Sequence, residues 1–192
     1  MFMALQQTTK WDDYLMGGTA LADTLTVNHA RCKATGRGGD DVITSYGNFN
    51  LLEGSEGNDV LIFGNTNKTV NGDAGNDTFK VYSYAADGSN NTLTGGGGND
   101  TYIISTGLVG VDVSRAETAP YNQSNSDTVN VTITDAKAGD SYYLRDYGLN
   151  DINVSTTADG VIISSASGRI KVTMKNCDRN AVKNNLITFD TA

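Results

Sequence analysis

The amino-acid sequence predicts an all-β fold: a parallel β-roll, that is, a right-handed β-helix of 18-residue coils, with a C-terminal antiparallel β cap. A nine-residue repeat runs from residue 18 to residue 103. Its eighth position is apolar every time, and its sixth position is an aspartate at every second repeat. A short period with one apolar residue per strand is typical of a solenoid, in which stacked coils bury what a single coil cannot.

The apolar position establishes the period. Nine blocks of nine residues cover 18–103, with one five-residue insertion, "VYSYA" (81–85). Nine apolar residues in a row are improbable by chance in a chain that is 38% hydrophobic. The eighth positions are Leu25, Ala34, Ile43, Leu52, Leu61, Val70, Phe79, Leu93 and Tyr102.

The sixth position doubles the period. Aspartate stands there in alternate blocks, and Cys32, Asn50, Lys68 and Asn91 stand there in the blocks between. The structural coil is therefore 18 residues long, with one strand on each of two facing sheets and one turn at each end. The aspartates of this column are Asp23, Asp41, Asp59, Asp77 and Asp100.

A column of aspartates requires a compensating charge. Stacked strands lie about 4.8 Å apart, so like charges in successive turns repel each other unless a cation lies between them. No lysine or arginine recurs at this position of the repeat. Carboxylates together with the carbonyls of glycine-rich turns form an all-oxygen ligand set, which favours Ca²⁺ over Mg²⁺.

Four blocks carry the pattern almost completely, and they resemble the nonapeptide G-G-x-G-x-D-x-U-x of the RTX (repeats-in-toxin, hemolysin-type) calcium-binding family, where U is a large apolar residue. The four blocks are "GRGGDDVIT" (36–44), "GSEGNDVLI" (54–62), "GDAGNDTFK" (72–80) and "GGGGNDTYI" (95–103).

The resemblance implies how the ions are bound. Each Ca²⁺ lies between two turns, held by the first and third carbonyls and the aspartate of one turn and by the second and fourth carbonyls and the aspartate of the next. Four turns with three gaps imply about three ions in one column. The implied ligand residues are Gly36, Gly38, Asp41, Gly54, Ser55, Glu56, Gly57, Asp59, Gly72, Asp73, Ala74, Gly75, Asp77, Gly96, Gly98 and Asp100.

The chain departs from the family pattern in two respects. Arg37, Ser55 and Asp73 replace the second glycine, which matters little if only the carbonyl of that residue is used. Alternate blocks lack aspartate, so the second ion column common in the family is expected to be absent. Whether Asp23 helps to bind a fourth ion is left open, because "GTALAD" lacks the later glycine.

Three segments are expected along the chain: an N-terminal cap (1–17) that includes Trp11, Tyr14 and Leu15, the calcium-binding roll (18–103), and a C-terminal β-rich capping and secretion segment (104–192). The repeat fades near residue 105, although "SDTVNVTIT" (126–134) alternates like a half-buried strand.

Further along, residues 151–176 read as strands joined by turns at Asp159-Gly160 and Ser167-Gly168, and "NLITF" (185–189) reads as a final strand. An apolar strip on the outer face of one sheet is expected either to lie under this C-terminal segment or to contact a partner. The strip comprises Val42, Val60, Ile62 and Ile103.

Composition and net charge limit the classes of partner that the chain is expected to bind. The net charge of −8 and pI of about 4.4 argue against nucleic acid and anionic membranes as main partners. No apolar run approaches the roughly 20 residues of a membrane span, and the N-terminus does not read as a secretory signal peptide. Two cysteines, Cys32 and Cys177, leave a single disulfide open.

These observations favour a non-catalytic calcium-binding module of a secreted bacterial protein that folds on Ca²⁺ outside the cell. By resemblance, such proteins leave by one-step (type I) export with an uncleaved C-terminal signal. A single histidine, His29, forms no metal cluster, and Glu53 with Glu56 is a weak candidate for a glycosidase pair. Two alternatives stay open: an adhesin or glycan-binding module that uses the flat sheet, and the C-terminal targeting part of a secreted hydrolase.

Overall fold

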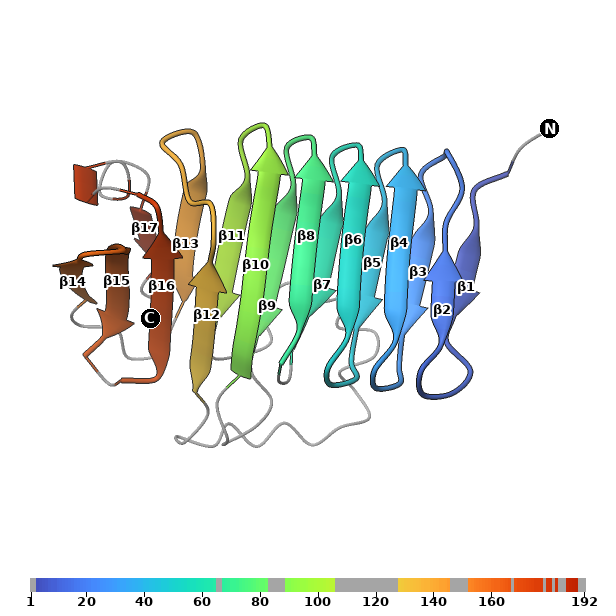
Figure 1. Ribbon diagram of the computed structural model, residues 1–192, viewed down its shortest axis with the longest axis horizontal. Helices are drawn as coiled ribbons and strands as arrows, with labels where there is room; N and C mark the ends of the chain where they lie inside the picture. Colours follow the sequence, from blue (N-terminus) through green and yellow to red (C-terminus); the bar gives the residue numbers. More distant parts are fainter. Residues whose placement is uncertain are drawn as a thin grey trace.

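The computed structural model consists almost entirely of β-strands in two facing sheets (Figure 1). It describes residues 3–64, 67–82, 89–105, 128–145, 152–166, 168–177, 179–180, 182 and 186–189. The eight-stranded sheet consists, in spatial order, of β1 (Gln6–Thr8), β3 (Thr24–Val27), β5 (Val42–Ser45), β7 (Val60–Phe63), β9 (Thr78–Tyr82), β11 (Thr101–Ser105), β13 (Ser141–Arg145) and β17 (Leu186–Phe189).

The second sheet has nine strands and lies in front in Figure 1. In spatial order it consists of β14 (Ile152–Thr157), β15 (Gly160–Ser165), β16 (Ile170–Lys175), β12 (Val129–Ile133), β10 (Ser89–Gly97), β8 (Thr69–Ala74), β6 (Leu51–Glu56), β4 (Lys33–Gly38) and β2 (Leu15–Gly17).

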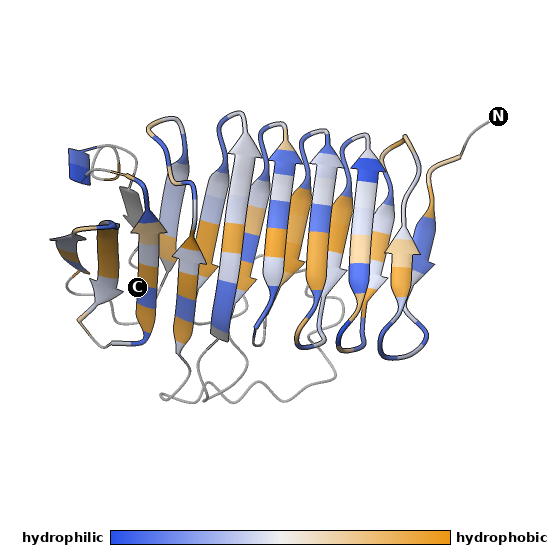
Figure 2. Ribbon diagram, in the orientation of Figure 1, coloured by the Kyte–Doolittle hydropathy of each residue, from blue (hydrophilic) through white to orange (hydrophobic). Residues whose placement is uncertain are grey.

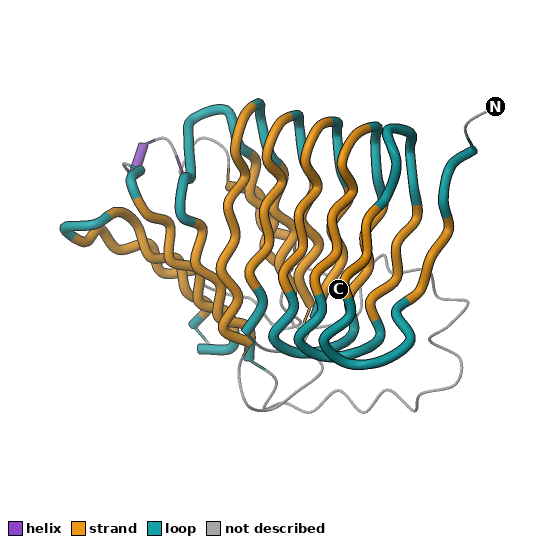
Figure 3. The backbone as a smooth tube through the Cα atoms, turned by 45° about the vertical axis from the view of Figure 1, so that its right-hand side comes forward, coloured by secondary structure: helices purple, strands orange, loops and turns teal. Residues whose placement is uncertain are grey.

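The pairing confirms the parallel β-roll. Odd-numbered strands β1 to β13 pair in parallel with one another, and even-numbered strands β2 to β12 do the same in the other sheet. Val42 pairs with Val60, and Val60 with Thr78, so each coil has 18 residues. The five-residue insertion lengthens the next coil, in which Thr78 pairs with Thr101. Figure 3 shows the resulting regular alternation of strands and turns.

The core is the column of apolar side chains between the two sheets. All nine predicted eighth positions are fully buried, at 0% exposure. Figure 2 shows orange hydrophobic bands at matching heights on several neighbouring strands of the roll. Three aromatic rings continue the column in the eight-stranded sheet: Tyr102 stacks on Phe79 with ring centroids 4.9 Å apart and on Tyr142 with centroids 5.4 Å apart. Such stacking adds to the burial of the rings themselves.

The parallel sheets extend beyond the repeat at both ends. Residues 6–17 contribute β1 and β2, which pair with β3 and β4 one coil later. After residue 105, where the period was expected to fade, Leu93 pairs with Ile133 and Tyr102 with Tyr142. The repeat therefore resumes in 126–143 after a long insertion. Strands β16 and β17 continue the two sheets.

The C-terminal strands form the predicted antiparallel arrangement. Strand β14 pairs with β15, and β15 with β16, in antiparallel register at one end of the second sheet. The described part of the C-terminal segment thus lies within the two sheets, and residues 106–127 lie outside the described residues. The outer apolar strip defined above is half-buried.

At the N-terminal end, Trp11 and Leu15 are 59% and 70% exposed, so these two expected capping residues leave much of their apolar surface in solvent. Cys32 and Cys177 are not joined by a disulfide bond. Among the described residues, no helix is long and apolar enough to cross a membrane.

Candidate metal centre

The aspartate turns form a buried column along one side of the roll, at the upper edge in Figure 1. The five aspartates of the column are at most 2% exposed. In the four aspartates after Asp23, one carboxylate oxygen, Oδ1, accepts a hydrogen bond from the backbone N–H of the preceding aspartate in the column, whereas Oδ1 of Asp23 accepts one from the N–H of Leu5. The N–H donors and distances are Asp23 to Asp41, 2.7 Å, Asp41 to Asp59, 2.7 Å, Asp59 to Asp77, 2.9 Å, and Asp77 to Asp100, 3.1 Å.

The column has a sixth member that the repeat did not reveal. Asp140 is fully buried, and its Oδ1 accepts a hydrogen bond of 3.0 Å from the N–H of Asp100. It occupies the sixth position of "DAKAGDSYY" (135–143), in which Tyr142 is the eighth. Restarting the nine-residue frame at residue 126 would have found both, but the insertion after Ser105 hides the frame.

The second carboxylate oxygen, Oδ2, is bonded differently in the middle of the column and at its ends. In Asp41, Asp59 and Asp77 this oxygen is buried and has no hydrogen-bond partner. In Asp23 it accepts a hydrogen bond from the N–H of Thr19, and in Asp100 it contacts Lys137. Burying a carboxylate oxygen removes its hydrogen bonds to water, and this costs free energy unless another group replaces them. Three consecutive oxygens of this kind therefore indicate three positions for a ligand.

Glycine lets the carboxylate of each turn pack directly against the backbone at the start of that turn. A Cβ added to Gly54 would lie 2.2 Å from Oδ2 of Asp59 and 2.8 Å from the carbonyl oxygen of Gly72 in the next turn. The first glycines of the neighbouring turns, Gly36 and Gly72, have the same surroundings, each facing the Oδ2 of its own turn and a carbonyl oxygen of the next. An unpartnered carboxylate oxygen and a carbonyl oxygen thus face one small space, which suits a hard cation.

The turn backbone is left-handed at the second and fourth positions of each block. Arg37, Ser55 and Asp73 take φ of 84°, 86° and 73° at the second position, where Gly96 takes 92°. The fourth positions, all glycine, have φ between 92° and 140°. The second position therefore requires a left-handed backbone, which glycine adopts most easily. Replacing its glycine thus carries a conformational cost, contrary to the expectation that only the carbonyl of this residue matters.

Burial and repulsion between neighbouring carboxylates raise the pKa values of the aspartates in the middle of the column. Burial raises the pKa of Asp41 to about 6 and that of Asp77 to about 7, and neighbouring carboxylates add to both shifts. Burial likewise raises the pKa of Asp59. A cation between the turns would reverse these shifts because it favours the charged carboxylate.

The sixteen expected ligand residues lie in four turns that stack directly on one another. Across the described residues, no three His, Cys, Asp or Glu side chains converge on one point. A cation here would therefore depend mainly on carbonyl oxygens, as the resemblance implies. Asp23 offers little to a fourth ion, because both of its oxygens already accept backbone hydrogen bonds, from Leu5 and Thr19.

A second ladder, which the sequence reasoning missed, lies beside the aspartates. The fifth-position side chains accept hydrogen bonds from the backbone N–H of the fifth residue in the next turn. The N–H donors are Asn58 to Asp40, 2.7 Å, Asn76 to Asn58, 2.8 Å, and Asn99 to Asn76, 2.8 Å. This ladder points opposite to the aspartate ladder, so the two together fix the spacing of the turns. The repeated Asn-Asp pair was its signal in the sequence.

The turns on the other side of the roll use amides instead of carboxylates. Asn50 and Asn91 accept hydrogen bonds from the N–H groups of Cys32 and Lys68, at 2.8 and 3.0 Å. Lys68 is buried, its ammonium donates to the carbonyl of Gly64, and burial lowers its pKa to about 7. Asparagine thus performs the backbone-bonding role of aspartate without the charge.

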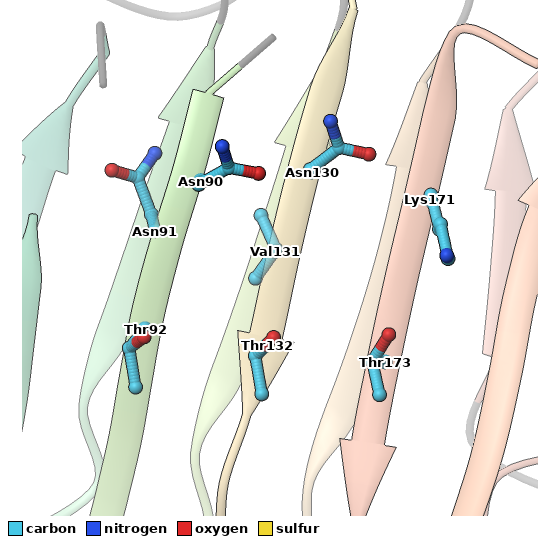
Figure 4. Close-up of a pocket in the computed structure, with 8 residues that line it drawn as sticks. All are labelled: Asn90, Asn91, Thr92, Asn130, Val131, Thr132, Lys171 and Thr173. Atoms are coloured by element: carbon cyan, nitrogen blue, oxygen red, sulfur yellow. The ribbon is translucent and has the colours of Figure 1, made fainter. Parts of the chain in front are cut away.

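A polar hollow lies on the outer face of the second sheet, away from the aspartate turns (Figure 4). Asparagine and threonine side chains of β10 and β12, together with β16, stand in rows there, with Asn90 beside Asn130 and Thr92 beside Thr132. Lys171 stands at the edge of the hollow.

No protein-family model matches the chain, and no curated protein sequence does. Among solved structures, the chain is similar to the crystal structure of the extracellular lipase LipA from Serratia marcescens, at 12% sequence identity and a TM-score of 0.34. The match covers 88% of this chain and 38% of the lipase.

Proposed function

We propose that the chain is a calcium-binding module of the RTX type, in which three Ca²⁺ ions bind between the turns 36–41, 54–59, 72–77 and 95–100. The observation that carries the proposal is the run of three buried Oδ2 atoms without partners, on Asp41, Asp59 and Asp77. Each lies beside a glycine and a carbonyl oxygen of the next turn.

The chemistry of the gaps favours calcium. Their donors are carboxylate and carbonyl oxygens, the ligands that Ca²⁺ binds in irregular sets of six to eight. Mg²⁺ demands a near-ideal octahedral set at short distances and gives up its water reluctantly, so flexible turns rich in carbonyl oxygens suit it less well. Bound Ca²⁺ would supply the positive charge that the column lacks.

The resemblance to the RTX family suggests the biological role. The module is non-catalytic and belongs to a secreted bacterial protein. Low cytosolic calcium keeps the turns from stacking during type I export, and calcium outside the cell orders them. The parent protein can be a hydrolase whose catalytic part lies elsewhere.

The decisive experiment is a count of bound ions. Isothermal titration of chelator-treated protein with CaCl₂, together with anomalous scattering from crystals grown in calcium, should give three ions, one in each gap. Absence of an ion between residues 36–41 and 54–59 would refute the proposal.

A second candidate function, binding of a polar ligand such as a glycan, is favoured by the hollow of Figure 4, where neutral amide and hydroxyl groups stand in rows. A glycan array would test it, with Asn130→Ala and Thr132→Ala as the variants expected to lose binding.

A further inference from the structure

The fourth gap of the column, between the turns 95–100 and 135–140, contains a positive charge from the chain itself. The ammonium of Lys137 lies 2.9 Å from Oδ2 of Asp100 and 3.7 Å from Oδ1 of Asp140. It also donates a hydrogen bond of 2.6 Å to the carbonyl oxygen of Gly96, in the earlier of the two turns. Two carboxylates from successive coils and one turn carbonyl therefore surround one nitrogen.

The position of this ammonium corresponds to those of the unpartnered oxygens. Oδ2 of Asp100 is the atom equivalent to the Oδ2 atoms of Asp41, Asp59 and Asp77, which have no partner. All four aspartates are held in the same way through Oδ1 by the backbone of the preceding turn. Among the described residues, a lysine thus supplies a cation in the last gap, and no side chain does so in the three before it.

We infer that Lys137 replaces a fourth calcium ion and ends the ion column. The inference builds on the proposed calcium sites. It predicts that the last gap is closed by an ammonium that is always present, so the coil after Asp100 docks without a calcium ion of its own. It also predicts that removal of the ammonium creates a new cation site at Oδ2 of Asp100 and the carbonyl of Gly96, because that Oδ2 would then be buried without a partner, as in the three gaps before it. Asp140 would contribute its negative charge to this site and no free oxygen, since both of its oxygens accept backbone hydrogen bonds.

The test is the number of calcium ions bound by the folded full chain, counted by native mass spectrometry at saturating CaCl₂. The wild type should bind three and Lys137→Ala four. Lys137→Arg keeps the positive charge and should bind three. Lys33→Ala is the matched control, because Lys33 forms a comparable 2.8 Å ion pair with Glu53 on a strand outside the column; it should also bind three.

The outcomes separate this inference from the proposed function. Three ions in both the wild type and Lys137→Ala would overturn the role of Lys137 and leave the calcium module intact. Four ions in the wild type would overturn it as well, as would a Lys137→Ala chain that stays unfolded at saturating calcium. If the wild type bound none and Lys137→Ala one, the role of Lys137 would stand and the three-ion module would fall. No binding by either protein would refute both.

Discussion

Each aspartate of the column uses its two carboxylate oxygens differently. Oδ1 accepts a backbone hydrogen bond from the neighbouring turn and so fixes the spacing of the coils. In the middle of the column Oδ2 is left for a ligand. Because one oxygen is already bonded, an Asp→Asn change can retain the structural contact while it removes the charge, which separates the two roles experimentally.

Asp59 should matter more to calcium binding than Asp100. Asp59 borders two of the proposed ion gaps, whereas Asp100 borders one ion and Lys137. Asp59→Asn is expected to raise the calcium midpoint for folding by about tenfold, the change that corresponds to roughly 1.4 kcal/mol of lost binding free energy, and Asp100→Asn by less. Asp23→Asn is the control with little effect, since both Asp23 oxygens bond to backbone. Circular dichroism during calcium titration measures all three midpoints, and equal midpoints for Asp59→Asn and Asp100→Asn would contradict shared ligation.

Gly54→Ala should block one gap by steric exclusion. The new Cβ would lie 2.2 Å from Oδ2 of Asp59 and 2.8 Å from the carbonyl oxygen of Gly72, closer than such atoms can approach. We expect at least one fewer calcium ion by isothermal titration. Gly97→Ala is the matched control, because its Cβ would meet nothing closer than 3.7 Å and the stoichiometry should stay at three. A full complement of ions in Gly54→Ala would show that this space is not used.

Acid should weaken calcium binding and stabilise the calcium-free chain. Burial raises the folded-state pKa of Asp41 to about 6 and of Asp77 to about 7, above the ordinary value of 3.8. The calcium-free fold thus holds protons more tightly than the unfolded chain, so its free energy of unfolding falls as pH rises from about 4 to about 7. Calcium competes with those protons, so the apparent calcium affinity should rise over pH 5 to 8. Far-UV circular dichroism in chelator at pH 4 and 7.5, where the β signal should be larger in acid, and calcium titrations at pH 5 and 7.5 check both trends; an affinity that did not change with pH would contradict buried carboxylate ligands.

At the scale of the elements, the left-handed second positions fall within strands β4, β6, β8 and β10. These strands therefore combine a regular ladder with a turn backbone that glycine suits best. Where the chain places Arg37, Ser55 or Asp73 instead, the turn is under conformational strain.

Replacing one of these residues by glycine should stabilise the roll. Ser55 has φ of 86°, which glycine adopts without a steric cost. Ser55→Gly is expected to raise the free energy of unfolding in calcium by about 1 kcal/mol, the order of the left-handed penalty for other residues. Urea denaturation measures the change. Gly96→Ser should lose more than this amount, because its Cβ would also lie 2.0 Å from the carbonyl oxygen of Asp73. A loss of stability in Ser55→Gly would mean that its side chain contributes more than its backbone costs.

Much of the architecture could be predicted from the sequence because the repeat encodes it directly. The eighth-position residues from Leu25 to Tyr102 predicted the core, the alternating aspartates predicted the 18-residue coil, and Asp159-Gly160 predicted a hairpin turn. The continuation of the roll could not be read so easily. Tyr102 pairs with Tyr142, so this coil is 40 residues long. A search for a fixed nine-residue period loses the frame at such a long insertion.

The same limit applies to the candidate site. The four turns and their buried aspartates were predictable from in-phase recurrence, since stacking brings together every eighteenth residue. Lys137 and Asp140 were not, because they belong to the coil beyond the insertion. Nor does the sequence alone distinguish the Oδ2 of Asp23, which is bonded, from that of Asp41, which is not; that difference depends on the backbone of Thr19.

At the scale of the whole molecule, the roll has a long, narrow core and the chain has a large net negative charge. Each strand buries few side chains, so the apolar area per ordered residue is small compared with the backbone entropy lost on folding. The net charge is −8, and three Ca²⁺ ions would add six positive charges and leave −2. The cations therefore change the balance of the entire solenoid and not only that of the turns they contact.

Folding of the repeat and binding of calcium should consequently be one transition. An empty aspartate column repels itself, and ion binding supplies the free energy that the core lacks. We expect a far-UV circular dichroism signal of disordered chain in chelator and of β-structure in calcium, with a midpoint of about 10⁻⁴ to 10⁻³ M, as in extracellular calcium modules. Magnesium at the same concentrations should give little of this change, because it needs a small octahedral set of ligands and gives up its water reluctantly. The control is a calcium titration of Asp41→Asn/Asp59→Asn/Asp77→Asn, which should stay disordered over this range because all three gaps have lost a carboxylate. If the wild type kept its full β signal in chelator, the roll would be stable without ions, and export in an unfolded state would need another explanation.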